Sequence, residues 1–181
     1  MKLTPGELHH LTELSMSCVN SITNMALFQH SVTDEKLKNL ITTHFPLHIQ
    51  DYNMKVKFLR EANGPQEKLN VPALNKMLTD FTQGATPVPV TPRTQVMQLN
   101  DREIATAYLL TLKRAGREYA CGAMEAANPE LREFLKDAFT MACNHAYDVF
   151  QWMAEKGFYA LAPAPQPAID AAGQFFNLVQ G

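Results

Sequence analysis

The sequence predicts an all-α protein, and three observations support this expectation. Apolar residues recur at three- and four-residue spacings through four long segments, residues 5–32, 34–62, 101–127 and 129–157. Within each pair the break is only a residue or two, so the paired helices must be antiparallel. A segment far longer than an ordinary helix–helix loop, residues 63–99, separates the two pairs. This order predicts a ferritin-like antiparallel four-helix bundle with a long crossover between helices 2 and 3.

Start and stop signals bound the four segments. Thr4 and Glu7 are spaced as a capping box at the start of the first helix, and Asn128-Pro129 is a typical start for the fourth. Gly157 suits the end of the fourth helix. Pro46 lies inside the second helix and should kink it, because proline removes a backbone donor. We expect one domain over residues 1–181, with hairpins at 5–62 and 101–157.

The crossover and the tail are rich in proline. We expect a short helix at residues 72–81 and an extended stretch at residues 85–92, where prolines are too dense for a helix. Because the stretch is also apolar, it should pack along the bundle. In the tail, residues 158–181, an amphipathic piece at residues 168–179 is expected to dock on its own bundle or on a partner subunit.

Composition excludes several classes of function. The formal net charge is -2, without the basic face that a nucleic-acid-binding protein needs. No stretch approaches the ~18 apolar residues of a membrane span, and the N-terminus lacks the apolar core of a signal peptide. Cys18, Cys121 and Cys143 are odd in number and scattered, which favours buried thiols in a reducing compartment. We therefore expect a soluble protein made in the cytoplasm.

Polar residues on the predicted inward faces are the candidate metal ligands. The usual di-metal set of a ferritin-like bundle needs Glu-x-x-His, and this chain has none. However, His44, His48 and Asp51 share one face of the second helix, at spacings of four and three. His145 lies near the seam of the fourth helix and Glu118 borders that of the third. These five residues could hold one Fe, Mn or Zn ion.

Two other interpretations of these residues remain open. Asp51 could accept hydrogen bonds from His48 or His145, with Tyr108 and Tyr119 closing a satisfied core network. Alternatively, the residues could lie at a subunit interface. Apart from the metal, no cofactor is expected, because no nucleophile–base arrangement, phosphate loop or glycine-rich nucleotide fingerprint occurs.

The second hairpin resembles the spore coat protein F (Coat F) family over Leu99 to Leu161. The matching pieces are Asn100-Asp101 with Ile104-Ala105, Leu112-Lys113, Glu125, Asn128-Pro129-Glu130-Leu131-Arg132, and Met153-Ala154-Glu155-Lys156-Gly157-Phe158-Tyr159. One departure is Phe158, where the family usually shows Trp before the Tyr. The resemblance covers about a third of the chain.

The resemblance implies a ferritin-like bundle associated with sporulation, as a coat or coat-associated protein. It transfers no catalytic residues. The first hypothesis is therefore a non-catalytic spore-coat-like protein, a homodimer with other coat proteins as partners. The second is a metal-binding ferritin-like protein capable of redox chemistry, and a third is a core pocket that binds a small apolar ligand.

Overall fold

The protein is all-α, as predicted. A computed structural model describes residues 2–61, 63–77 and 85–179, and it has no strand among them. The helices are α1 (Pro5–Ser31), α2 (Glu35–Arg60), α3 (Asp101–Glu125), α4 (Pro129–Glu155) and α5 (Gln166–Phe175). The four long helices begin and end within two residues of the predicted positions, because the capping residues that mark their starts are present in the sequence.

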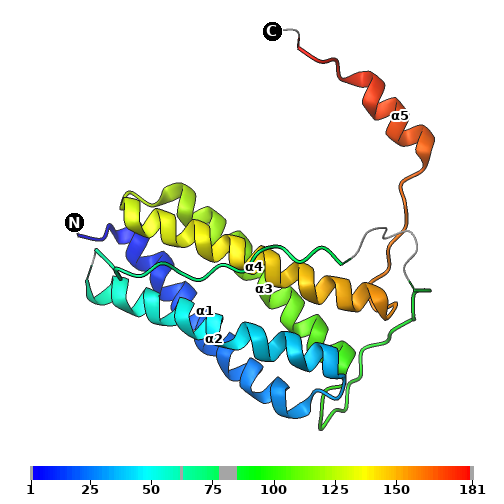
Figure 1. Cartoon of the computed structure of the whole chain (residues 1–181), viewed down its shortest axis with the longest axis horizontal. Coiled ribbons are helices and arrows are strands. Elements are labelled where there is room, and N and C mark those ends of the chain that lie inside the picture. The colour runs from blue at the N-terminus through cyan, green and yellow to red at the C-terminus, as the bar shows by residue number, and fades with distance from the viewer. Residues whose placement is uncertain (1, 62, 78–84, 180–181) are drawn as a thin grey trace.

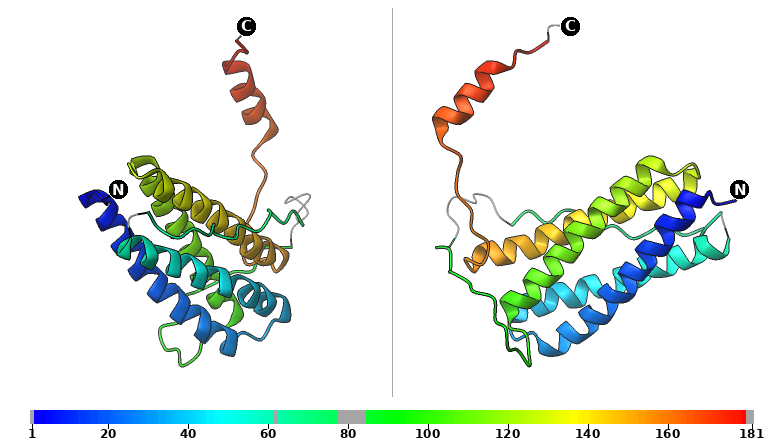
Figure 2. Two further views of the ribbon diagram at one scale, coloured as in Figure 1. Left: turned by 60° about the vertical axis from the view of Figure 1, so that its left-hand side comes forward. Right: turned by 180° about the vertical axis from the view of Figure 1, so that it is seen from behind.

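The four long helices pack around a shared interior (Figures 1 and 2). The main packing pairs are α1 with α2, α3 with α4, α1 with α3, and α2 with α4. Neighbouring helices are antiparallel: His10 near the start of α1 contacts Glu125 at the end of α3, and Thr33 beyond the end of α1 contacts Asp101. The crossover therefore connects α2 to α3, which lie diagonally across the bundle and run in the same direction.

Side-chain caps set the helix starts. Thr4 forms a capping box with Glu7, and Asn100 forms one with Glu103. The side chains of Asp34 and Asn128 accept hydrogen bonds from the first turns of α2 and α4. Pro46 lies within α2, which is continuous from Glu35 to Arg60.

Two carboxylates join the hairpins at opposite ends of the bundle. Glu7 of α1 accepts a 2.7 Å hydrogen bond from the backbone N–H of Asn128, in the α3–α4 loop. Asp101 of α3 accepts hydrogen bonds from the backbone N–H groups of Thr33 and Asp34, in the α1–α2 loop. Each hairpin thus binds the loop of the other hairpin through a carboxylate acceptor. Hydrogen bonds to a charged acceptor are stronger than those between neutral groups.

The buried face of α1 differs in register from the one that residue spacing predicts. A regular three–four spacing predicts an inward seam through Leu8, Leu11, Ser15, Cys18, Ile22, Met25 and Gln29. Of these, Leu11, Cys18 and Met25 are buried, whereas Leu8 is 52% exposed. Leu14 and Phe28 are buried instead, because these larger apolar side chains face the core in place of the polar Ser15 and Gln29.

The first half of the crossover follows the surface between α2 and α4. Leu69 is buried, and three amide side chains hold the backbone: Gln50 on Lys68 and Asn70, Asn144 on Pro72, and Gln151 on Asn75 and Met77. The prediction of a short helix here is wrong for residues 72–77, which are irregular. Residues 78–81 lie outside the described part of the chain. The backbone of residues 72–77 forms hydrogen bonds to side chains of α4 instead of the backbone hydrogen bonds of a helix.

The second half of the crossover is extended, as predicted, but it is not packed into the bundle. Residues 85–99 are all exposed. Its anchors include the 2.8 Å hydrogen bond from Val88 N–H to the Gly157 carbonyl and a 3.0 Å hydrogen bond from Arg102 Nη1 to the Pro89 carbonyl. Arg93 also forms an ion pair with Glu103 of α3. Gly157 has a φ of 71°, and a Cβ there would lie 2.3 Å from the Thr86 carbonyl oxygen, so glycine permits this close approach.

Helix α5 projects away from the bundle in all three ribbon views (Figures 1 and 2). None of its residues is buried. Ile169, Phe175 and Phe176 are at least 49% exposed. The expected docking on its own bundle is therefore not seen, and within the described part of the chain the apolar side chains of the tail remain exposed.

Candidate functional site

The interior holds a polar group that we call the lysine cluster, made of Cys18, Asp51, Lys55 and Tyr119. The side chains of Asp51 and Lys55 are both 0% exposed. The Lys55 ammonium lies 2.5 Å from Asp51 Oδ2, 3.0 Å from the Tyr119 hydroxyl and 3.2 Å from Cys18 Sγ. Because an ammonium carries three N–H donors, each donor has its own acceptor.

The Cys18 thiol and the Tyr119 hydroxyl, the other two members of the lysine cluster, remain protonated and neutral. Burial raises the pKa of Cys18 to about 11 and raises that of Tyr119 well above its usual value. Both groups donate to the same atom, Asp51 Oδ2, at 3.2 Å from the thiol and 2.7 Å from the hydroxyl. The cluster therefore contains one positive and one negative charge, held by neutral donors around the carboxylate.

The lysine cluster joins all four long helices. Cys18 comes from α1, Asp51 and Lys55 from α2, and Tyr119 from α3. The ring of Phe134, on α4, lies 5.6 Å from the Lys55 nitrogen, within the range of a cation–π contact. Since an unpaired buried charge is very unfavourable, these helices must keep the register that brings the groups together.

One turn along α2 lies the second polar group, the histidine cluster, made of His44, His48, Tyr108, His145 and Asp148. The Tyr108 hydroxyl lies 3.0 Å from His44 Nδ1 and 3.1 Å from His48 Nε2. His145 Nδ1 lies 3.3 Å from His48 Nε2, and His44 Nε2 lies 3.2 Å from Asp148 Oδ2. The rings of His44 and His145 stack at 3.6 Å between centroids.

Neutral imidazoles fit this geometry as a directional chain of hydrogen bonds. His48 Nε2–H donates to Tyr108, the Tyr108 hydroxyl donates to His44 Nδ1, and His44 Nε2–H donates to Asp148. The chain links Tyr108 of α3 and Asp148 of α4 to the imidazoles of α2.

Burial keeps two of the histidines neutral. Desolvation lowers the pKa of His48 to about 4 and that of His145 to about 2, with the positive charge of nearby groups adding to the effect for His145. The carboxylate of Asp51 opposes the shift for His48 but does not cancel it. At neutral pH both rings are therefore available as hydrogen-bond acceptors or metal ligands.

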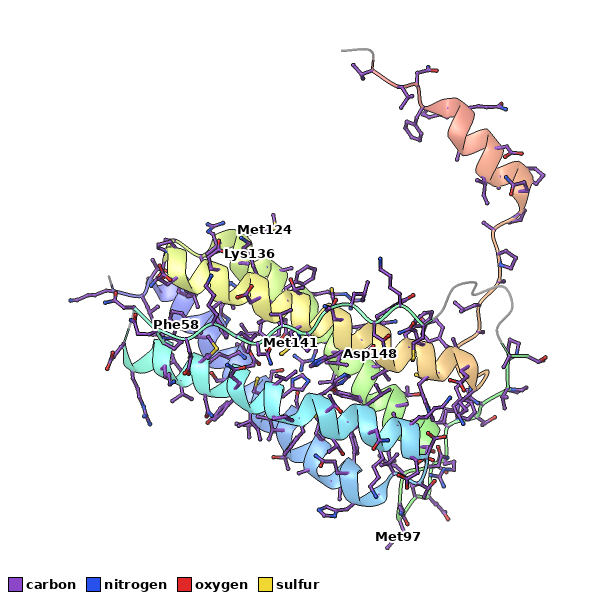
Figure 3. The ribbon with its side chains drawn as sticks, viewed as in Figure 1. Phe58, Met97, Met124, Lys136, Met141 and Asp148 are labelled. Carbon is purple, nitrogen blue, oxygen red and sulfur yellow. The ribbon has the colours of Figure 1, made fainter. Side chains whose placement is uncertain are left out.

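One side of the histidine cluster faces a pocket of about 760 Å³ between α2, α4 and the crossover. His44 and Asp148 line it together with apolar side chains that include Leu40 and Trp152. Figure 3 shows Asp148 and the buried Met141 along the side of α4 that faces α2. Among the described residues, three buried side-chain atoms have no hydrogen-bond partner: Asp148 Oδ1 and His145 Nε2 in this cluster, and Asp51 Oδ1 in the lysine cluster.

The five predicted ligands fall into three places. His44, His48 and His145 meet in the histidine cluster. Asp51 is one turn away and is bound by Lys55 and Tyr119. Glu118 lies at the surface, where it forms an ion pair with Arg114 at 2.8 Å.

Sequence analysis missed two members of the interior groups, Lys55 and Asp148. A signal for Lys55 was present, because it follows Asp51 by four residues on the face that also carries His44 and His48. Asp148 follows His145 by three residues in the same way. Spacing alone is a weak signal for either residue, because charged residues in amphipathic helices usually face solvent.

The expectation for the cysteines is right for one of the three. Cys18 is buried, whereas Cys121 and Cys143 are exposed free thiols. Composition alone does not distinguish these positions, since the face that each residue occupies depends on the packing of its helix. None of the described helices combines the length and apolar character that crossing a bilayer requires.

Comparison with known proteins identifies the second hairpin. The Coat F domain family matches residues 100–162, which span α3 and α4 and the residues just after them. A crystal structure from Bacillus halodurans C-125, described as that of a candidate spore coat protein, aligns with a TM-score of 0.67. The alignment covers 91% of this chain and 96% of that chain at 14% identity, which shows a shared fold. No match was found among curated proteins. The predicted Coat F resemblance is thereby confirmed.

Replacing Lys55 by Met should destabilise the protein strongly. The substitution leaves the Asp51 carboxylate buried without its cation, which typically costs about 3–5 kcal/mol of unfolding free energy. The double variant Asp51→Leu, Lys55→Met removes both charges and should recover most of that loss. Urea unfolding of the three proteins measures the effect, and equal stability of the single and double variants would contradict the role given to the pair.

Stability should fall as the pH drops from about 6.5 toward 4. The pKa of His48 is about 4 in the folded protein, against an ordinary value of 6.5, so the unfolded chain binds a proton that the folded protein excludes. The stabilisation is complete above pH 6.5 and is lost on acidification, on the order of 2–3 kcal/mol for this group. Urea unfolding between pH 7.5 and 4.5 should give a shallower pH dependence for His48→Gln. An identical slope in both proteins would show that His48 titrates normally.

Proposed function

We propose that this protein, whose second helical hairpin is a Coat F domain, is a non-catalytic structural component of the bacterial spore coat. The observation that carries the proposal is the family match over residues 100–162, the part of the chain that forms α3 and α4. The spore-coat description of the Bacillus halodurans protein, whose fold is shared over nearly the whole chain, supports the same role.

We assign the bundle to the ferritin-like type. What supports this is the connection between its hairpins: α1 and α2 pair, α3 and α4 pair, and one long crossover joins the diagonal helices α2 and α3. Bundles with a single long crossover have this topology. The first hairpin is then the structural counterpart of the Coat F hairpin, within one domain.

The interior favours a structural role over catalysis. In the lysine cluster every donor of Lys55 has an acceptor within the cluster. In the histidine cluster, Tyr108 is bound to two imidazoles and His44 to a carboxylate. Groups that already bond to one another are stabilising elements of a core, and none is a nucleophile aimed at the pocket.

Assembly is expected to use the tail. Helix α5 and the residues after it expose the side chains of Ile169, Phe175, Phe176, Leu178 and Val179. Large apolar side chains gathered on one free segment are typical of contact surfaces. By contrast, the small residues of α3 are used inside the subunit: a Cβ at Gly116 would lie 3.7 Å from that of Ala142 on α4. We infer that the tail mediates a homodimer and contacts with other coat proteins.

A fluorescent fusion of the chain produced in a sporulating bacterium should label the coat of the mature spore. The variant Phe175→Ser, Phe176→Ser should be monomeric by light scattering and should lose most of its coat signal, while melting like the parent because both rings are exposed. Met124→Ser is the matched control, since Met124 is 79% exposed on the bundle itself. A fusion that stays in the cytoplasm of the sporulating cell would contradict the proposal.

The histidine cluster supports a second candidate function, binding of Fe, Mn or Zn in the core. His48 Nε2 and His145 Nδ1 lie 3.3 Å apart. Two nitrogens bound to one tetrahedral ion at about 2.0–2.1 Å are separated by about 3.3 Å. His44 stacks on His145 and bonds to Tyr108 and Asp148, so it would have to move to supply a third imidazole. Asp51 and Glu118 would likewise have to leave their present partners to take part.

Elemental analysis of protein purified without a histidine tag tests the core site. Near-stoichiometric metal that disappears in the His44→Ala, His48→Ala variant would establish it. Metal content well below one ion per chain, with melting unchanged by chelator, would leave the cluster as a hydrogen-bonded core. The change in metal content is independent of where the protein is found in the spore.

A further inference from the structure

At the end of the bundle opposite the α1–α2 loop, three side chains able to ligate metals meet on the surface. His10 comes from α1, and Cys121 and Glu125 come from α3. One ligand atom from each residue lies within 4.8 Å of the others. Among the described residues, this is the place where three such donors come that close. None of the three belongs to the lysine or histidine cluster.

The spacing of the three donors suits one ion. His10 Nε2 lies 3.1 Å from Glu125 Oε2, and Cys121 Sγ lies 4.0 Å from Glu125 Oε1. In a tetrahedral zinc site with bonds of about 2.0–2.3 Å, neighbouring ligand atoms lie roughly 3.3–3.8 Å apart. Cys121 and Glu125 are four residues apart on one helical face, so small side-chain rotations close the remaining gap.

The His10 imidazole packs against the backbone of α3, which limits its movement. A Cβ at position 122 would lie 3.8 Å from His10 Cγ, so the ring packs directly against the α3 backbone at Gly122. The ring is only partly exposed, at 29%, whereas Glu125 is 65% exposed and free to adjust. A pocket of about 140 Å³ borders both residues and leaves room for a fourth ligand, such as water.

We propose that His10, Cys121 and Glu125 form a binding site for a divalent ion of the zinc class. The combination of a thiolate, an imidazole and a carboxylate favours such a borderline ion over Mg²⁺ or Ca²⁺, which prefer oxygen ligands alone. Binding displaces the thiol proton of Cys121, so affinity rises with pH. The bound ion ties the start of α1 to the end of α3, close to the hydrogen bond between Glu7 and Asn128.

Titration of the reduced full-length protein with Co²⁺ tests the site. Cobalt bound by a thiolate gives an intense near-ultraviolet charge-transfer band, which reports a cysteine ligand directly and should be reversed by Zn²⁺. The Cys121→Ser variant should lose the band and bind at least tenfold more weakly. His10→Ala should keep a weaker band that needs at least tenfold more Co²⁺.

Matched controls separate this site from the rest of the chain. Cys143→Ser removes the other exposed thiol, and His9→Ala removes the neighbouring histidine; both should titrate like the wild type. His48→Ala should also keep the band, because the core cluster contributes no thiolate to it. Absence of a band in the wild type, or a band that survives Cys121→Ser, would overturn the proposal whatever the role of the protein in the spore.

Discussion

The bundle is organised around an ion pair with no access to water. Asp51 and Lys55 are both fully buried, and their charges would be prohibitively unfavourable apart. Their partners come from three other helices: Cys18 on α1, Tyr119 on α3 and the ring of Phe134 on α4. A slip of α1, α2 or α3 by a turn would remove a donor or acceptor from this group, and a slip of α4 would remove the ring of Phe134. The pair therefore specifies the register of the bundle, which apolar packing alone leaves more tolerant.

The carboxylates of Glu7 and Asp101 help to fix the same helix register at the two ends of the bundle. Glu7 binds the α3–α4 loop and Asp101 binds the α1–α2 loop, so each hairpin closes against the other. Hydrogen bonds from Thr4 and Asn128 outweigh the effect of burial on Glu7 and lower its pKa, which keeps it ionised at neutral pH. The helices are thus fixed at the middle by a buried pair and at both ends by charged caps.

The helix boundaries were predictable because they depend on nearby residues in the sequence. The features that were not predicted depend on contacts between residues far apart in the sequence. Thr4, Asn100 and Asn128 mark helix starts through their own side chains, so the helix boundaries were accessible from the sequence. His44, His48 and His145 were identified because they fall on apolar seams. The partner of Asp51 was not, because a lysine is ordinarily solvated and only the packed bundle excludes water from Lys55. Likewise, the backbone of residues 72–77 is bound by the side chains of Asn144 and Gln151 instead of forming a helix, and those contacts are long-range.

The repeated His-x-x-Asp spacing explains how the two interior clusters differ. The same 97 residues separate His48 from His145 and Asp51 from Asp148. His48 and His145 also lie next to each other, with 3.3 Å between His48 Nε2 and His145 Nδ1. The aspartates have different partners, because at the positions equivalent to His44 and Lys55 the second hairpin carries Met141 and Trp152. Asp51 is neutralised by Lys55 on its own helix, whereas Asp148 must use His44 from α2. The first hairpin thus supplies the cationic or imidazole group that pairs with each aspartate, so the second hairpin depends on the first to bury Asp148.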